Sequence, residues 1–186
     1  MSILIDLRSV IDEGVGASLT IKGSTATEGD SGSASVATSE LAQFKLGNID
    51  FSCVTPISYE LNFINTGECI QASGFLRTDL STECVRCLCD FCFGLDSAIE
   101  ETYFFEATDD EHGEPYPVID DSLKIDIEPL LREALLVEAP FAPVHDDDCQ
   151  GLCVTCGADL NRDDCNCGDE PDASHPFAGL KDLIDS

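Results

Sequence analysis

Most of the eleven cysteines in this chain fall into two clusters whose spacing is typical of metal ligands. The C-terminal cluster has the pattern C-x2-C-x8-C-x-C and comprises Cys153, Cys156, Cys165 and Cys167. Four thiolates can close on one tetrahedral zinc ion, and tight turns can donate backbone N–H groups to the sulfurs. Because only Asn166 separates the last two cysteines, one ligand could instead come from elsewhere. The alternative interpretation is a set of reduced or redox-sensitive thiols.

A second zinc site is predicted from residues far apart in the chain. Cys84 and Cys87 form another C-x2-C pair, which needs two further ligands. His145 and Cys149 form an H-x3-C motif just beyond a predicted helix, which could return the chain to this pair. Counting ligands in fours therefore predicts one site from Cys84, Cys87, His145 and Cys149, and up to two structural zinc ions in all.

The remaining cysteines have simpler expected roles. The segment from Cys84 to Cys92 is itself C-x2-C-x-C-x2-C and could bind a metal locally, although such a cage would be tight. We expect Cys89 and Cys92 to be ordinary strand residues near a hairpin end. Cys53 and Cys69 stand alone in the sequence and are expected to act as small apolar core residues.

The motifs favour structural zinc sites in a non-enzymatic protein over an enzyme. A four-ligand zinc site is closed to substrate, whereas a catalytic zinc keeps one open position. The sequence contains no phosphate-binding glycine loop, no nucleophile elbow and no HExxH helix. The carboxylates are spread through predicted loops and form no evident acid/base pair. We therefore predict no catalytic residues.

Charge restricts the partners that the chain can bind. The 186 residues include 9 Lys plus Arg against 37 Asp plus Glu, a formal net charge of −28. Direct binding to a nucleic-acid backbone requires a dense basic patch, and no window of the sequence offers one. A basic protein is the natural complement of such a surface. With 43% hydrophobic residues, the chain can still form a core.

The cellular compartment can also be inferred. No run of residues approaches the roughly 18 to 20 apolar residues of a membrane helix, and the opening MSILIDLRSV lacks the pattern of a secretory signal. We therefore expect no membrane association and a cytoplasmic location, where the cysteines remain reduced or bind metal.

Hydrophobic periodicity predicts the elements that must position these ligands. Strict alternation over residues 57–63 predicts a strand with one wet face. Further strands are predicted at residues 3–7, 18–22, 69–72, 74–82, with a possible bulge at Gly74, and 93–105. The C-x2-C pair would then lie at a hairpin tip. Residues 23–40 and 106–122 are expected to be loops.

The C-terminal part combines a helix with the cysteine-rich tail. Apolar residues at helical spacing from Ile127 to Leu135 predict an amphipathic helix, with Asp126 as cap and Pro140 at its end. A short docking helix is predicted over residues 176–184. We predict an α+β fold, an antiparallel meander packed with a few helices, as a main domain at residues 1–144. Residues 145–186 would form a metal-binding, zinc-ribbon-like tail.

In combination these motifs resemble the YceD family, the large ribosomal RNA subunit accumulation proteins. The resemblance rests on CVRCL at residues 84–88, IDIEPLLREALLVEAPFAPVH at 125–145, the cysteine-rich segment 149–167 and HPFAGLKDL at 175–183. Relatives of this kind often carry a cysteine in place of His145, which would be an exchange of one ligand for another. The resemblance implies a non-enzymatic role in ribosomal RNA accumulation and ribosome biogenesis.

Three hypotheses follow. The first is a zinc-stabilised acidic protein that binds a basic ribosomal protein or assembly factor. The second is a thiol redox protein or zinc-release sensor that uses the C-x2-C cysteines, since Arg86 between two cysteines could lower a thiol pKa. The third, direct RNA binding through the C-terminal tail, is the least compatible with the net charge.

Overall fold

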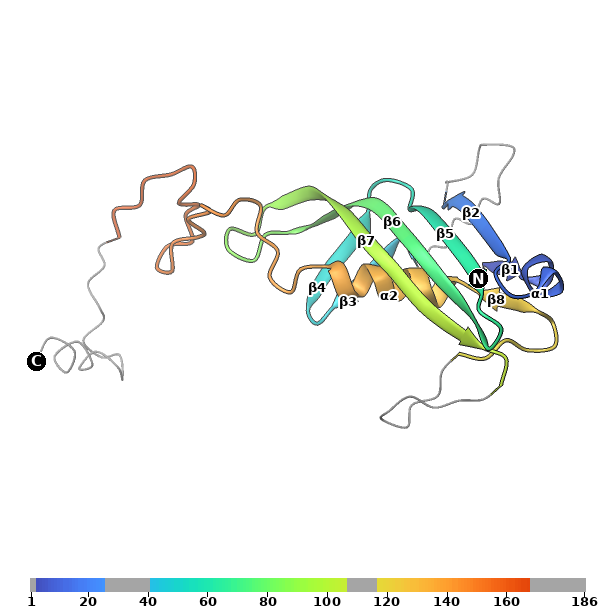
Figure 1. Cartoon of the computed structure of the whole chain (residues 1–186). Coiled ribbons are helices and arrows are strands. Elements are labelled where there is room, and N and C mark those ends of the chain that lie inside the picture. Colours follow the sequence, from blue (N-terminus) through green and yellow to red (C-terminus); the bar gives the residue numbers. More distant parts are fainter. Residues whose placement is uncertain (1–2, 26–40, 107–116, 168–186) are drawn as a thin grey trace, which may run out of the picture.

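Alternating apolar and polar residues build a six-stranded antiparallel sheet, which is the centre of the molecule in the computed structural model (Figure 1). The structure describes residues 3–25, 41–106 and 117–167. The elements in chain order are β1 (Leu4–Asp6), α1 (Arg8–Glu13), β2 (Ser18–Ser24), β3 (Gln43–Leu46), β4 (Ile49–Cys53), β5 (Ser58–Asn65), β6 (Cys69–Glu83), β7 (Asp90–Phe104), β8 (Lys124–Asp126) and α2 (Glu128–Glu138).

The long strand β6 organises the sheet. β5 and β4 pair with successive parts of one edge of β6, and β7 pairs with its other edge along all fifteen of its residues. The strand order is β2-β5-β6-β4-β3, with β7 added to β6. The predicted α+β class is confirmed, because antiparallel strands dominate and two helices accompany them.

The strand predicted by strict alternation lies in the middle of the core. Tyr59, Leu61 and Phe63 of β5 are buried, whereas the residues between them are half-buried. The bulge considered at Gly74 is absent, since the register between β5 and β6 runs without a break. The reason for glycine there is close packing, because a Cβ atom would lie 2.0 Å from the carbonyl oxygen of Glu60.

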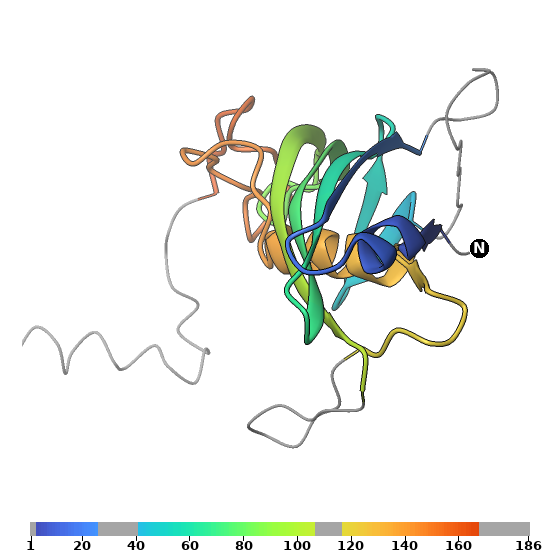
Figure 2. The ribbon, with the colours of Figure 1, turned by 45° about the vertical axis from the view of Figure 1, so that its right-hand side comes forward.

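Helix α2 covers one face of the sheet against β7 (Figure 2). Its buried face includes Leu130, Leu131 and Leu135, as the spacing predicts. Asp126 contributes through its side chain: Oδ1 accepts hydrogen bonds from the backbone N–H groups of Glu128 and Ile3. These bonds tie the start of the helix to the small sheet of β1 and β8.

Some sequence predictions need correction. The strands β3, β4 and β8 were not expected, and Gly23 and Ser24, assigned to a loop, end strand β2. Residues 117–119 of the second predicted loop are also ordered, because Val118 forms a β-bridge with Phe104. The core cluster excludes Cys69, which is half-buried with its thiol 3.0 Å from Thr66 Oγ1, while Cys53 packs against that core as expected.

Several predictions fall outside the described residues. These are most of the first loop, at 26–40, part of the second, at 107–116, and the docking helix at 176–184. The boundary between main domain and tail at residue 144 stays a prediction. Among the helices in the described part of the chain, none has the length and apolar character to cross a membrane.

Candidate metal centres

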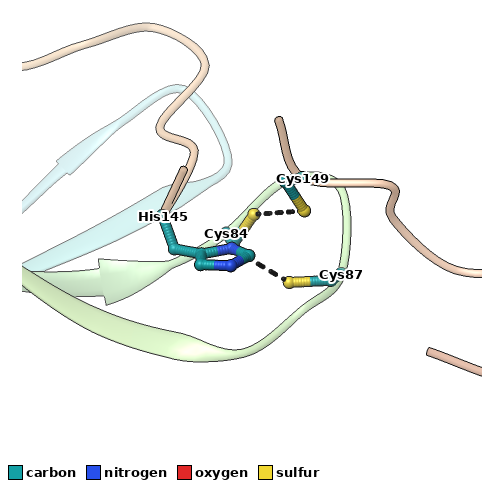
Figure 3. Close-up of side chains that lie close together, drawn as sticks. All are labelled: Cys84, Cys87, His145 and Cys149. Carbon is teal, nitrogen blue, oxygen red and sulfur yellow. Dashed lines mark hydrogen bonds between the residues drawn. The ribbon is translucent and has the colours of Figure 1, made fainter. Parts of the chain in front are cut away.

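The turn between β6 and β7 meets the segment that follows α2, and four potential ligands come together there (Figure 3). Cys84 and Cys87 lie on the turn, whereas His145 and Cys149 lie beyond the helix. The four ligand atoms all lie within 4.8 Å of one another. The Sγ atoms of Cys84 and Cys149 are 3.9 Å apart, and Cys87 Sγ is 3.4 Å from His145 Nδ1.

These separations fit a tetrahedral zinc ion. Typical zinc bonds of about 2.3 Å to sulfur and about 2.0 Å to nitrogen place two sulfurs about 3.8 Å apart and a sulfur and a nitrogen about 3.5 Å apart. The cysteine side chains are buried and His145 is exposed, so the imidazole forms the solvent-facing wall of the site. We refer to this set of four residues as the hairpin site.

Backbone contacts and one arginine hold the two halves of the hairpin site together. The N–H group of Val85 donates to the carbonyl of Pro143 at 3.0 Å. Arg86 donates from Nη1 to the carbonyl of Asp147 at 2.9 Å and to that of Cys149 at 3.1 Å. These bonds fix the segment carrying His145 and Cys149 against the hairpin tip without using the ligand atoms.

The four cysteines of the tail form a second cluster, which we call the tail site. The sulfurs of Cys153, Cys156, Cys165 and Cys167 also lie within 4.8 Å of one another. Cys165 Sγ is 3.3 Å from Cys153 Sγ and 3.5 Å from Cys156 Sγ. These distances are a few tenths of an ångström below those in a zinc tetrahedron, so a small outward movement of the sulfurs would accommodate the ion.

Both C-x2-C segments fold into the same turn. In the hairpin site, the N–H group of Leu88 donates to the carbonyl of Cys84, and the N–H group of Cys84 donates to the carbonyl of Cys89, both at 2.9 Å. In the tail site, the N–H group of Gly157 donates to the carbonyl of Cys153, and the N–H group of Cys153 donates to the carbonyl of Ala158, both at 2.8 Å.

The backbone conformation after the second cysteine is also shared. Leu88 has φ 60° and Gly157 has φ 74°, both in the left-handed region. Two sequence segments with different flanking residues thus adopt one ligand-presenting turn. This shared geometry favours metal binding by both segments over an unrelated role for one of them.

Hydrogen bonding favours one thiolate in the hairpin site. Burial opposes ionisation of Cys84, yet hydrogen bonds from His145 and from the backbone N–H group of Cys87 lower the pKa of its thiol to about 5. Burial raises the pKa of Cys149. The backbone N–H group of Cys89 lowers the pKa of Cys87, but burial and neighbouring thiols outweigh it, so that this pKa is raised. Further charge on adjacent sulfurs requires a cation such as Zn²⁺.

Hydrogen bonding also favours one thiolate in the tail site. Backbone N–H groups of Cys156 and Thr155 lower the pKa of Cys153 to about 6. Contact with the thiols of Cys165 and Cys156 raises the pKa of Cys167 to about 12. Each cluster therefore has one sulfur prepared as a thiolate and others that would ionise as a metal ion binds.

The structure brings together all eight predicted ligands, in the two groups of four expected from the sequence. The local cage that would have used Cys92 is not formed, because Cys92 is exposed and lies outside both groups. Cys89 is closer to the site than expected, with its Sγ 3.2 Å from that of Cys87. Asn161 links the two sites by donating from Nδ2 to Cys149 Sγ at 3.6 Å.

A family model and one named relative indicate the same family. Residues 72–184 match the family model described as Large ribosomal RNA subunit accumulation protein YceD. The chain is 26% identical over 165 residues to the Large ribosomal RNA subunit accumulation protein YCED homolog 1, chloroplastic, of Arabidopsis thaliana, covering 73% of this chain and 51% of that protein. No solved structure matches the chain significantly.

The chain is also similar to mycobacterial proteins. An uncharacterized protein of Mycobacterium leprae is 28% identical over 125 residues, covering 64% of this chain and 56% of that protein. An uncharacterized protein of Mycobacterium bovis is 32% identical over 108 residues, covering 56% of this chain and 51% of that protein. The chain thus spans about half the length of the curated relatives it matches.

Proposed function

The chain belongs to the YceD family of large ribosomal RNA subunit accumulation proteins, and from this premise we propose that it supports the accumulation of large-subunit ribosomal RNA. The family match over residues 72–184 is the observation that carries this proposal. We further propose that the chain acts without catalysis in the cytoplasm, by binding a basic ribosomal protein or assembly factor.

The metal would have a structural role in this proposal. Cys84, Cys87, His145 and Cys149 would hold one zinc ion, and Cys153, Cys156, Cys165 and Cys167 would hold another. Each ion would neutralise adjacent thiolates and leave no open position for a substrate. The protein's own contribution is to present the first two cysteines of each site on matching turns, and to fix the segment that carries His145 and Cys149 through Arg86. Residues 145–167 would then be a rigid part of the surface.

Charge supports a basic protein as the partner. The formal net charge is −28, and carboxylates already neutralise many of the basic side chains. Ion pairs of this kind involve Arg8, Lys22, Lys45, Arg77, Arg132 and Arg162. A surface of this composition attracts Lys- and Arg-rich segments and repels RNA, so it would shield a ribosomal protein until that protein docks on RNA.

The first test measures ribosomal RNA in a strain that lacks the chain. We expect the ratio of large- to small-subunit ribosomal RNA to fall, and expression of the natural chain to restore it. Expression of the Cys69→Ser variant should restore it equally, because Cys69 lies outside both metal clusters. An unchanged ratio in the deletion strain would reject the proposed function.

The second test addresses the partner. The purified chain should bind purified large-subunit ribosomal proteins at about 0.1 M salt and release them as salt approaches about 1 M, because screening shortens the range of charge attraction. Binding of the purified chain to ribosomal RNA in the absence of any other protein, with a steep salt dependence, would reject a basic partner and favour direct RNA binding.

Redox sensing remains a second candidate because of one contact. The thiols of Cys87 and Cys89 are 3.2 Å apart, so a peroxide could oxidise them to a disulfide while the peroxide is reduced to water or an alcohol. Each thiol would lose its proton and the pair would lose two electrons, and the hairpin site would lose one ligand. Zinc release by stoichiometric hydrogen peroxide that disappears in the Cys89→Ser variant would favour this candidate.

A further inference from the structure

In the described part of the chain, strand β7 (Asp90–Phe104) has no partner strand along its outer edge over residues 90–100. Within the described part of the chain, β7 pairs with β6 alone, and their register has no interruption over fifteen residues. Long edge strands are uncommon in stable proteins unless something covers them, since they present rows of unpaired backbone groups. The outer edge of β7 is therefore a surface that needs an explanation.

The backbone groups that point outward from β7 can be identified. On β6, the carbonyl of Asp79 accepts from the N–H group of Val54, so odd-numbered residues of β6 face away from β7. The register pairs even-numbered β6 residues with odd-numbered β7 residues, such as Thr78 with Leu95. Backbone groups alternate along a strand. The N–H and C=O groups of even-numbered β7 residues, Ala98 among them, therefore point outward.

The chain itself already uses one end of this edge. The N–H group of Phe104 donates to the carbonyl of Pro117 at 2.9 Å, and the N–H group of Ile119 donates to the carbonyl of Phe104 at 2.9 Å. These bonds form a β-bridge between Phe104 and Val118. The outer edge thus accepts an extended segment where one is supplied, and the same geometry continues over residues 90–100.

A groove runs beside the outer edge, between residues 97–101 of β7 and helix α2 (Glu128–Glu138). Its volume is about 220 Å³. Glu133, Val137 and Glu138 of the helix line its far side, and Val137 is 73% exposed. An added strand would place alternate side chains in this groove and the others on the opposite face, beside Asp96 and Glu100.

The charge of these surroundings selects the ligand. The residues lining the groove include four glutamates, Glu100 among them, and no basic side chain. The opposite face of β7 also presents Asp90 and Asp96, of which Asp96 pairs with Arg77 on β6. We propose that the outer edge of β7 binds an extended Lys/Arg-rich protein segment by adding it as a strand to the sheet. This inference rests on the proposed function. It adds that the basic partner is recognised as an extended strand at the edge of the sheet.

A second copy of the chain is a poorer occupant of the same edge. Antiparallel pairing of two β7 strands centred on Leu95 would set Asp90 of one copy opposite Glu100 of the other. Like charges directly opposite each other destabilise a strand pair. The acidic side chains therefore oppose self-association while matching a basic segment.

The test uses a synthetic peptide of alternating lysine and valine, about ten residues long, which at about 3.4 Å per residue spans positions 90–100. The full chain should bind it, and NMR should show slower hydrogen exchange at the amides of Ala98 and Glu100. A matched peptide, N-methylated at every residue, keeps the charges but loses the backbone donors. It should bind at least about tenfold more weakly, the change expected from losing about 1.4 kcal/mol of backbone hydrogen bonding.

A substitution on the protein complements the peptide pair. Ala98→Pro removes one outward N–H group and leaves the β6 ladder intact, as edge strands tolerate. We expect at least about tenfold weaker binding of the unmethylated peptide. The control Ala98→Ser should bind it like the natural chain. If the proline variant unfolds, the comparison of the two peptides and the amide exchange rates of the natural chain still test the inference.

Three results would overturn this inference. Equal affinity for both peptides, with unchanged exchange at Ala98, would mean attraction by charge alone, which leaves the basic partner of the proposed function in place. No binding of either peptide at low salt would remove both the strand addition and the support for a basic partner. Dimerisation with protected β7 amides in the absence of peptide would show that the edge is already filled by a second copy.

Discussion

The Sγ atoms of Cys84 and Cys149 lie 3.9 Å apart, although 65 positions separate the two residues. If this proximity serves a zinc ion, Cys149→Ser should lower the zinc content by about one ion per chain and weaken binding at the hairpin site more than about 100-fold, a larger effect than loss of an outer hydrogen bond. Elemental analysis of protein purified under reducing conditions measures this. Cys69→Ser, which changes a cysteine outside both sites, should retain the full metal content.

If His145 is a zinc ligand, we expect that another zinc ligand can replace its imidazole but that its removal abolishes binding. His145→Cys should keep zinc at the hairpin site, because a thiolate is an equally suitable ligand. His145→Ala should lose it. The edge-on contact between His145 and Phe91, with ring centroids 6.5 Å apart, would be lost in both variants and therefore does not distinguish them. Equal zinc content in the two variants would remove His145 from the ligand set.

Exchanging leucine and glycine at the equivalent positions of the two matching turns should have opposite effects on stability. Leu88 is 54% exposed and has φ 60°, a conformation that costs a non-glycine residue about 1 kcal/mol. Leu88→Gly should therefore raise the free energy of unfolding by up to about 1 kcal/mol, while Gly157→Leu should weaken the tail turn by a similar amount. Chemical denaturation suits the first variant, and competition for zinc with a chelator suits the second. Destabilisation by Leu88→Gly would contradict the role assigned to this backbone conformation.

Gly74 and Gly94 lie on paired strands but differ in the space around them. A Cβ atom at Gly74 would lie 2.0 Å from the backbone carbonyl oxygen of Glu60, whereas at Gly94 the nearest atom is Asp79 Oδ1 at 3.5 Å. Gly74→Ala should thus destabilise the protein by about 3 kcal/mol, through forced separation of β5 and β6. Gly94→Ala should change stability by less than about 1 kcal/mol. Urea denaturation of the two variants checks this, and equal midpoints would contradict it.

Elements with a strong local pattern could be predicted from the sequence. The alternation of Tyr59, Leu61 and Phe63 marks a strand with one buried face, and the helical spacing of Leu131 and Leu135 marks the buried face of α2. The hairpin of β3 and β4 was missed, although Gly47 and Asn48 form a two-residue turn signal between its strands. β8 has three residues and pairs with β1 across most of the chain, so no local pattern indicates it.

The two groups of candidate ligands could be predicted because a zinc site requires a fixed number of ligands at suitable spacing. Their supporting contacts could not be predicted. Arg86 reaches carbonyl groups at Asp147 and Cys149, and a bond from a side chain to a distant backbone leaves no mark in the sequence. The same holds for Asn161 beside Cys149 and for the approach of Cys89 to Cys87. Such contacts depend on how two distant segments meet after folding.

The position of the hairpin site also orders the events of folding. Cys84 and Cys87 belong to a hairpin whose strands are neighbours in the chain, so they can assemble early. We expect His145 and Cys149 to reach them only after α2 has packed against the sheet, because closing so long a loop costs entropy that the packed helix offsets. Capture of a metal ion at all four ligands would accordingly be a late step, and a metallated hairpin site would mark chains that have completed their main fold.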